Sequence, residues 1–275
     1  MTAFPAPGDL RATFLRLHES GCFVIPNPWD LGSARWLERL GFKALATTSS
    51  GFAWSQGRAD HEVSLADMLE HLRLIAGGVG VPVSADLGAG FAAEPSGVAA
   101  NVAAAAPTGI AGLSIEDGSG DAGRPLFDFA LSVERVRAAR RAIDDHGSGL
   151  LLTARSEGFI VGRPDLKETI RRLTAYAEAG AECLYAPGLK SRADIAAVVG
   201  AVAPRPVNVL VGSGFTTVSE MAALGVRRIS VGGALARAAW GGFLDAAREI
   251  AEHGVFSSLD RALSFDAVNK TFESD

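Results

Sequence analysis

The chain has 275 residues, enough for one large α/β domain with a full hydrophobic core. Its 26 basic and 31 acidic residues give a formal net charge of −5, which argues against a nucleic-acid surface or a polybasic membrane patch. Cys22 and Cys183 both lie in apolar runs, so we expect no disulfide framework and a reducing, cytoplasmic location. The sequence shows neither a secretory signal pattern nor an apolar run long enough to span a bilayer.

Short apolar runs alternate with amphipathic stretches along the whole chain. A helix is expected over residues 8–20, followed by a strand at 22–30. Seven further strands are expected, each after a helix, at 44–51, 81–87, 112–117, 150–157, 183–188, 206–212 and 228–233. The intervening helices are expected at 31–41, 64–79, 95–107, 132–147, 166–180, 191–202 and 217–225, and a long last helix begins at Ala234.

Eight strand–helix units in succession predict a (β/α)₈ TIM barrel. Gly41, Gly180 and Gly225 close helices just before the next strand. A doubly wound sheet would usually show GxGxxG after its first strand, and this chain does not. We therefore expect a single α/β domain over 1–275, with an N-terminal helix in 1–20 and a final helix and extension in 234–275. The end of that extension is expected to pack on the barrel wall or on a neighbouring subunit.

Two carboxylates stand at the ends of neighbouring expected strands, Asp86 after the third and Glu116 at the fourth. The carboxyl ends of parallel barrel strands meet at one rim, where ligands bind. Hard oxygen ligands without a nearby histidine or cysteine pair favour Mg²⁺ or Mn²⁺, so we expect a shared metal rather than a solvated carboxylate pair. At Asp30, Asp117 and Ser213 we expect simple turn capping.

A guanidinium inside the apolar strand at Arg155 is costly unless it meets an anion. Its partner is either Glu157 or Glu116, as a structural ion pair, or a substrate carboxylate, which we favour. The TTSSG turn at 47–51 offers hydroxyls and backbone N–H groups to a small anion. The histidines, His61 and His71 among them, are expected to face solvent.

Seven stretches together resemble the isocitrate lyase and phosphoenolpyruvate mutase superfamily: TTSSGF, VPVSADLGAGF, GLSIEDG, LLTARSEGF, GAECLYAPGL, NVLVG and LGVRRISVGGALARAAWGGF. The resemblance implies a barrel whose eighth helix is exchanged between subunits, in a homo-oligomer that is a dimer of dimers. It also implies a Mg²⁺ site and small-molecule substrates that are 2-oxo acids or break down to enol-type intermediates.

The same resemblance implies roles for individual residues. Asp86 is the principal metal ligand and also contacts substrate, Glu116 holds the metal through water, and Asp60 is an outer-shell carboxylate. Catalytic roles fall to Arg155, Glu116 and Asp60. Substrate contacts are implied for a group of residues near the strand ends: Ser50, Gly51, Phe52, Arg155 and Asn208.

The chain departs from the family pattern in two places. Gly88 stands where relatives commonly have a second aspartate, and the loop from Gly118 to Phe127, a plausible lid, lacks the lyase cysteine. A metal and Arg155 still suffice for a Mg²⁺-dependent lyase that acts on a 2-oxo or 2-hydroxy acid through an enolate, by carbon–carbon cleavage or decarboxylation. The alternatives are a phosphorus–carbon mutase or hydrolase and a non-catalytic 2-oxo acid binder. Candidate proton donors are Tyr185, Asp121 and a metal-bound water.

Overall fold

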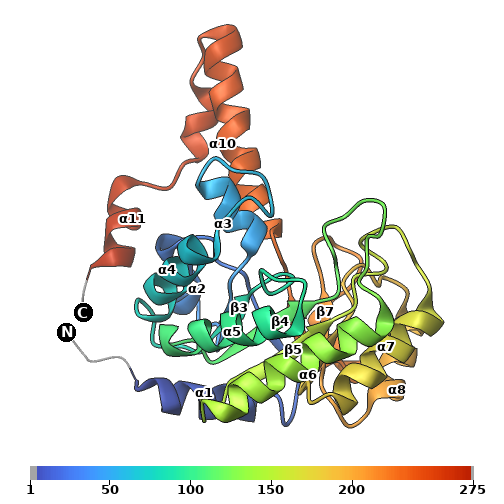
Figure 1. Cartoon of the computed structure of the whole chain (residues 1–275). Helices are drawn as coiled ribbons and strands as arrows, with labels where there is room; N and C mark the ends of the chain where they lie inside the picture. Colours follow the sequence, from blue (N-terminus) through green and yellow to red (C-terminus); the bar gives the residue numbers. More distant parts are fainter. Residues whose placement is uncertain (1–4, 274–275) are drawn as a thin grey trace.

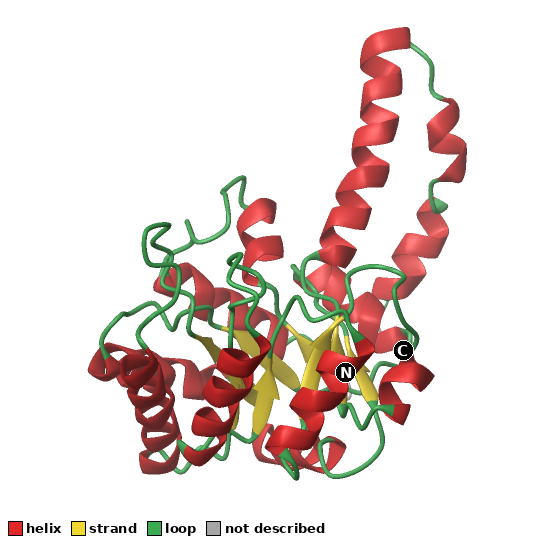
Figure 2. Ribbon diagram, turned by 90° about the vertical axis from the view of Figure 1, so that its right-hand side faces the viewer, coloured by secondary structure: helices red, strands yellow, loops and turns green. Residues whose placement is uncertain are grey.

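The computed structural model describes residues 5–273; residues 1–4 and 274–275, the outer ends of the predicted terminal segments, lie outside the described part. Eight parallel strands form one sheet in the order β1-β8-β7-β6-β5-β4-β3-β2. The backbone N–H of Ala46 donates to the carbonyl of Pro26 at 3.0 Å and brings the two ends of the sheet together. The predicted TIM-barrel fold is confirmed (Figures 1 and 2). The strands are β1 (Phe23–Ile25), β2 (Leu45–Ala46), β3 (Val83–Asp86), β4 (Gly112–Glu116), β5 (Leu151–Arg155), β6 (Cys183–Tyr185), β7 (Val207–Leu210) and β8 (Arg228–Ser230).

Helices follow the strands, and most of them cover the outside of the barrel (Figure 1). They are α1 (Pro7–Leu17), α2 (Leu31–Arg39), α3 (Ser49–Ser55), α4 (Leu65–Ala76), α5 (Pro95–Ala105), α6 (Phe129–Asp145), α7 (Leu166–Glu178), α8 (Arg192–Val202), α9 (Val218–Ala223), α10 (Ala234–His253) and α11 (Phe265–Phe272). Two short 3₁₀ turns, η1 (Ala106–Thr108) and η2 (Ser257–Arg261), complete the described part. Left-handed glycines close helices where the sequence predicted them, with φ of +87° at Gly41, +105° at Gly180 and +83° at Gly225.

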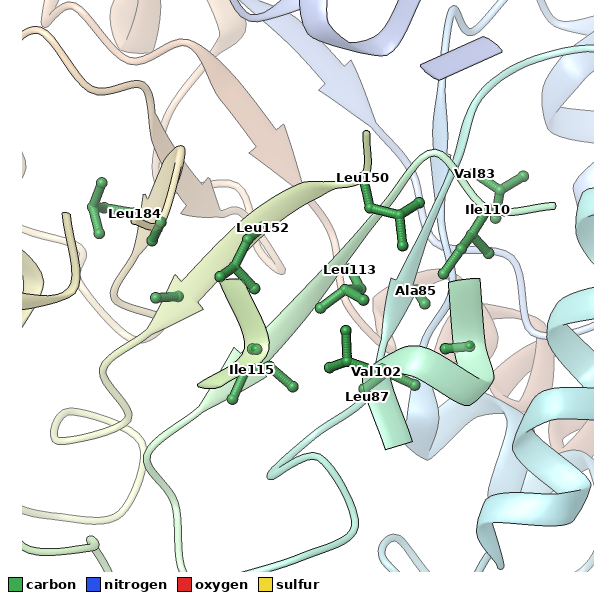
Figure 3. Close-up of a cluster of buried hydrophobic side chains, with 14 of the residues drawn as sticks. Val83, Ala85, Leu87, Val102, Ile110, Leu113, Ile115, Leu150, Leu152 and Leu184 are labelled. Carbon is green, nitrogen blue, oxygen red and sulfur yellow. The ribbon is translucent and has the colours of Figure 1, made fainter. Parts of the chain in front are cut away.

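Side chains along each strand point alternately outward, into the apolar core beneath the helices, and inward, into the barrel. In β4, Leu113 and Ile115 are buried among Val102 and other residues that pack between strands and helices (Figure 3). The intervening residues, Ser114 and Glu116, line the barrel interior. The other strands follow the same rule, because successive side chains of a strand point to opposite faces. The inward polar residues are therefore collected in one place by the fold.

Helix α1 closes the amino-terminal end of the barrel. Phe14 is fully buried there and packs with Ile25, Leu151 and Cys183. A Cβ on Gly112 would lie only 2.7 Å from the Phe14 ring, so the glycine allows this close approach. Cys22 and Cys183 are both free, in agreement with the expected lack of a disulfide framework within the described residues.

The second strand is much shorter than predicted. The 44–51 run was expected to be all strand, but β2 ends at Ala46 and α3 begins at Ser49. Thr48 caps α3, because its hydroxyl accepts the Gly51 N–H at 3.3 Å. The prediction was wrong because β-branched threonines favour strands in isolation, yet a threonine hydroxyl also starts a helix.

Helix α10 stands away from the barrel (Figure 2), while the chain beyond it returns to the wall. Ala236 is its one buried residue among those described. In α11, Phe272 meets Trp36 of α2 edge to face, and Arg39 donates to the Lys270 carbonyl at 3.0 Å. The C-terminal segment thus packs on the wall of its own barrel, one of the two predicted locations. None of the described helices is both long and apolar enough to cross a membrane.

Candidate active site

A cluster of three carboxylates surrounds one guanidinium at the carboxyl rim of the barrel. Arg155, the last residue of β5, places Nη1 2.8 Å from Asp86 Oδ1 and Nη2 3.0 Å from Glu116 Oε2. Its Nε lies 2.9 Å from Glu157 Oε1. The strand ends bring these groups together because β3, β4 and β5 are neighbours in the sheet.

The sequence left open whether Arg155 pairs with glutamates or with a substrate. The structure forms the pairs with both Glu116 and Glu157 and adds Asp86 as a third partner. A guanidinium has five N–H groups, so two remain for another acceptor. Contact between Arg155 and a substrate therefore stays a prediction.

Three carboxyl groups share one guanidinium in this cluster. Burial raises the pKa of Glu116 to about 8, Arg155 opposes that rise, and Glu157 adds to it. Burial also raises the pKa of Glu157 despite Arg155. For Asp86 burial acts upward, but Arg155 and hydrogen bonds from Ser49 outweigh it and lower the pKa. The site thus holds at least one carboxylate that lacks a full positive partner.

The donor chemistry fits a hard divalent cation. Asp86, Glu116 and Glu157 offer carboxylate oxygens, and the Ser49 hydroxyl donates to Asp86 Oδ2 at 3.0 Å beside them. Within residues 5–273, no group of three or more histidine, cysteine, aspartate or glutamate side chains is arranged so that it could hold a metal ion by itself. Asp86 and Glu116 remain the predicted ligands, with water and substrate oxygens as the other members of the shell.

The carboxylate cluster lies in a cavity of about 240 Å³. Eight residues were given site roles from the resemblance, and six of them line it: Ser50, Asp60, Asp86, Glu116, Arg155 and Asn208. Asp60 lies beside exposed His61, where its Oδ1 accepts the His61 N–H at 3.0 Å. Asn208 belongs to the buried inner end, where its side chain bonds Arg228 and Ser230.

Gly51 and Phe52 are not part of the cavity lining. A Cβ on Gly51 would lie 2.6 Å from Thr48 Cγ2 and 3.0 Å from Trp29 Cβ, so only glycine fits that turn of α3. Phe52 is buried and stacks on His71, with ring centroids 3.9 Å apart and planes 14° apart. Both residues thus pack α3 against its neighbours, away from the cavity. Their predicted contact with substrate remains a prediction.

Two predictions about buried residues were wrong: that the histidines face solvent and that Asp117 caps a turn. The first fails for His18, which is buried, and for His71. His71 does not face solvent: it is buried against Phe52, and burial lowers its pKa to about 4. Asp117 is not a turn cap, since its Oδ2 accepts the Tyr176 hydroxyl at 2.7 Å and Arg172 Nη1 at 3.0 Å. Its Oδ1 accepts the backbone N–H of Glu157 at 2.7 Å and so helps to position that glutamate.

The loop after β4 is held by its own backbone. Gly118 and Leu126 form an antiparallel bridge, and the Ser119 N–H donates to the Pro125 carbonyl at 3.0 Å. Asp121 Oδ1 accepts the Gly123 N–H at 2.8 Å, which assigns this side chain to the turn. A second cavity of about 620 Å³ lies between this loop and the carboxylate cluster.

Arg228 is the charged residue of the cavity lining that sequence reasoning missed. It lies on β8 within RISVGG, lines the cavity and is 5% exposed. The signal was available, because the cost of placing arginine in an apolar strand was applied to Arg155 and holds equally here.

Comparisons with known proteins support the fold described above. The family model described as phosphoenolpyruvate phosphomutase matches residues 14–251. A crystal structure from Burkholderia cenocepacia J2315, assigned only provisionally as a lyase or mutase, is 46% identical over 98% of this chain and 97% of that one, with a TM-score of 0.94. The structure of 2,3-dimethylmalate lyase, described as a member of the PEP mutase/isocitrate lyase superfamily, is 26% identical over 99% and 95%, with a TM-score of 0.83. The oxaloacetate decarboxylase of Bradyrhizobium diazoefficiens is 29% identical over 66% of this chain and 64% of its own length.

Proposed function

Because the chain belongs to the phosphoenolpyruvate phosphomutase family, within the isocitrate lyase superfamily of lyases and mutases, we propose that it is a Mg²⁺-dependent lyase. Its substrate is a small 2-oxo or 2-hydroxy acid, which it cleaves or decarboxylates through an enolate. The observation that carries the proposal is the buried cluster of Asp86, Glu116 and Glu157 around a single guanidinium, Arg155.

Asp86 and Glu116 are the residues that would hold Mg²⁺. When bound, the metal supplies Lewis-acid polarisation of the substrate's 2-oxo acid end. Arg155 offers its two remaining N–H groups to the oxygen that becomes negative in the transition state. Serine hydroxyls at the start of α3 stand beside Asp86, with Ser49 bonded to it and Ser50 in the cavity lining.

Tyr185 is a further hydrogen-bond donor for the oxygen that becomes negative in the transition state. Its ring lies under the Arg155 guanidinium, with 5.1 Å between the Arg155 carbon Cζ and the ring centroid. Burial raises the pKa of Tyr185 to about 12, so its hydroxyl keeps its proton at neutral pH. It can therefore donate a hydrogen bond or a proton, but it does not act as a base.

Decarboxylation of an oxaloacetate-type acid suits the residues present. The reaction releases CO₂ from the carbon beside the carbonyl and needs no strong base. The loop from Gly118 to Phe127 contains no cysteine or histidine, so this segment supplies neither group for deprotonating a 2-hydroxy acid. The oxaloacetate decarboxylase relative favours the same substrate class.

A turnover panel tests the proposal. Oxaloacetate, isocitrate, methylisocitrate, 2,3-dimethylmalate and phosphonopyruvate are each incubated with protein and Mg²⁺, and products are followed by ¹H NMR. EDTA and protein-free Mg²⁺ samples control for metal-catalysed loss of oxaloacetate. Turnover that EDTA abolishes supports the lyase. Release of phosphate or rearrangement of phosphonopyruvate alone would move the assignment to a phosphorus–carbon enzyme, and binding of 2-oxo acids without turnover would indicate a binder.

We also propose that the functional unit is a homo-oligomer in which α10 packs against a neighbouring copy. The helix is about 30 Å long and presents exposed aromatic side chains, with Trp240 37% and Phe243 59% exposed. Such a group of apolar side chains on a projecting helix is typical of an interface. Exchange of this helix within a dimer of dimers would cover it.

A further inference from the structure

Arg228 is a buried cation whose contacts are all to neutral groups. Its Nε donates to Asn208 Oδ1 at 2.9 Å, and its Nη2 donates to Thr153 Oγ1 at 3.0 Å. Its Nη1 lies 3.2 Å from His18 Nε2. Among the ion pairs formed within residues 5–273, none includes Arg228. By contrast, Arg155 in the same cavity has three carboxylate partners.

His18 does not supply the missing negative charge. Its Nδ1 lies 2.8 Å from the Phe14 carbonyl, which can only accept, so Nδ1 carries a proton. Its Nε2 then presents a lone pair to Arg228, as a neutral imidazole requires. Burial, followed by the charge of Arg228, lowers the pKa of His18 to about 3. The imidazole is therefore an uncharged partner at neutral pH.

Asn208 and Arg228 together present donors to the inner end of the cavity. The oxygen of the Asn208 amide is occupied by Arg228, and one N–H donates to Ser230 Oγ at 2.9 Å. The second N–H of that amide is free to donate. Three N–H groups of Arg228 are engaged by its neighbours, which leaves two of five.

The two guanidiniums lie at different depths of one cavity. Arg228 bonds Thr153, which precedes Arg155 by two residues on β5. Two residues of strand span about 7 Å, comparable to the length of a short dicarboxylic acid. A ligand held at the rim by Arg155 and the carboxylate cluster would thus extend inward toward Arg228.

We propose that Arg228 and the amide of Asn208 form an anion subsite at the inner end of the cavity, which receives a second negatively charged group of the substrate. The inference rests on the proposed function, in which the 2-oxo acid end binds at the rim. It restricts the substrate class to 2-oxo acids with an anionic far end, such as dicarboxylates, and excludes monocarboxylates as good substrates. A buried cation without a counter-ion is costly, and a bound anion removes that cost.

Two four-carbon probes measure the subsite by isothermal titration calorimetry in Mg²⁺: 2-oxobutyrate and 3,3-difluorooxaloacetate. They share a 2-oxo acid end, and the second also carries a far carboxylate. Arg228→Met is expected to weaken the binding of 3,3-difluorooxaloacetate by about 10- to 100-fold, the usual effect of losing a hydrogen-bonded charge partner. Its effect on 2-oxobutyrate should stay within about twofold.

Asn208→Asp is the second variant, and it tests the subsite even if Arg228→Met does not fold. Its carboxylate would replace the amide oxygen that lies 2.9 Å from Arg228 Nε and become an internal counter-ion. We expect the same selective loss of the dicarboxylate with a melting temperature that is not lowered. Arg227→Met is the matched control, because it removes a charge one residue away whose guanidinium bonds the Gly21 carbonyl outside the cavity.

Three results would count against the subsite. Equal losses for both probes in folded Arg228→Met, or no loss for either, would make Arg228 a structural residue only. Full dicarboxylate affinity in Asn208→Asp would overturn the inference as well. Failure of wild-type protein to bind either probe with Mg²⁺ would overturn the proposed function itself, and with it the inference. The results with the two variants would leave the lyase proposal intact, whereas the wild-type result would not. Failure of the subsite and failure of the proposed function are therefore distinguishable.

Discussion

Acidification should destabilise the folded protein through His18, and the His18→Gln variant should lack this effect. In the folded state the imidazole is buried between Phe14 and Phe23, with ring centroids 4.7 Å and 5.1 Å away. Protonation there would place a charge beside Arg228 and remove the lone pair that faces Nη1. A glutamine can still donate to a carbonyl and accept from a guanidinium, but it does not titrate.

The size of the effect follows from the pKa of His18, which falls from 6.5 to about 3 on folding. Below pH 6.5 the unfolded state binds a proton that the folded state does not, so stability falls as the pH falls. The limiting slope is about 1.4 kcal/mol per pH unit. Between pH 7 and pH 5, His18 therefore removes about 2 kcal/mol from the free energy of unfolding, and the loss continues until the pH approaches 3.

The measurement is urea unfolding of wild type and His18→Gln at pH 7, 6 and 5. Other groups contribute as well: His71 acts in the same direction, whereas the raised pKa of Glu116 acts in the opposite one. These contributions are common to both proteins and cancel in the difference. Wild type should lose about 2 kcal/mol relative to the variant from pH 7 to pH 5. A difference that stays constant across this range would show that folded His18 accepts a proton, and the reasoning about its burial would be wrong.

Three further predictions concern the metal site, the interface and the turn of α3. Asp86→Asn keeps the shape of the side chain but removes its charge, and should lower Mg²⁺-dependent turnover by about 10²- to 10³-fold; turnover within twofold of wild type would exclude Asp86 as the principal ligand. Phe243→Glu should give a smaller species by light scattering after size exclusion, whereas Leu40→Glu, on a barrel leucine that is 69% exposed, should not; identical masses would refute the role of α10. Gly51→Ala should destabilise by about 1–3 kcal/mol in chemical unfolding, since its Cβ would meet Thr48 at 2.6 Å. Gly200→Ala in α8, where no atom lies within 4 Å of the new Cβ, should instead stabilise by about 0.5–1 kcal/mol, and a loss at Gly200 equal to that at Gly51 would contradict the steric argument.

Local pattern was sufficient to predict the barrel. Apolar runs separated by glycine-closed amphipathic segments fix eight strand–helix units, because periodicity and helix termination are properties of neighbouring residues. The same locality predicted Asp30 correctly as the cap of α2, where its Oδ1 accepts the Ser33 N–H at 2.6 Å. It also placed Asp86 and Glu116 at one rim, since the ends of parallel strands meet there.

The sequence alone could not decide which side chains from different strands and helices contact one another. Whether Arg155 meets glutamates, a substrate or both depends on which side chains β3 and β4 present to β5. His71 was read as solvent-facing and Asp117 as a turn cap because their partners lie elsewhere in the chain. These partners are Phe52 for His71, and Tyr176 with Arg172 for Asp117. Burial and charge compensation are sums over such distant neighbours, so no local pattern encodes them.

The sequence by itself therefore determined the eight-unit barrel, its family and the rim at which the chemistry is expected. Only the tertiary structure decided how charge is distributed within that rim. It gives Arg155 three carboxylates and gives Arg228 none, although both arginines lie on strands of the barrel. The physical reason is that the energy of a buried charge depends on the groups around it. In a barrel these groups can come from strands far apart in the chain, as with Asp86 and Arg155, which are 69 residues apart.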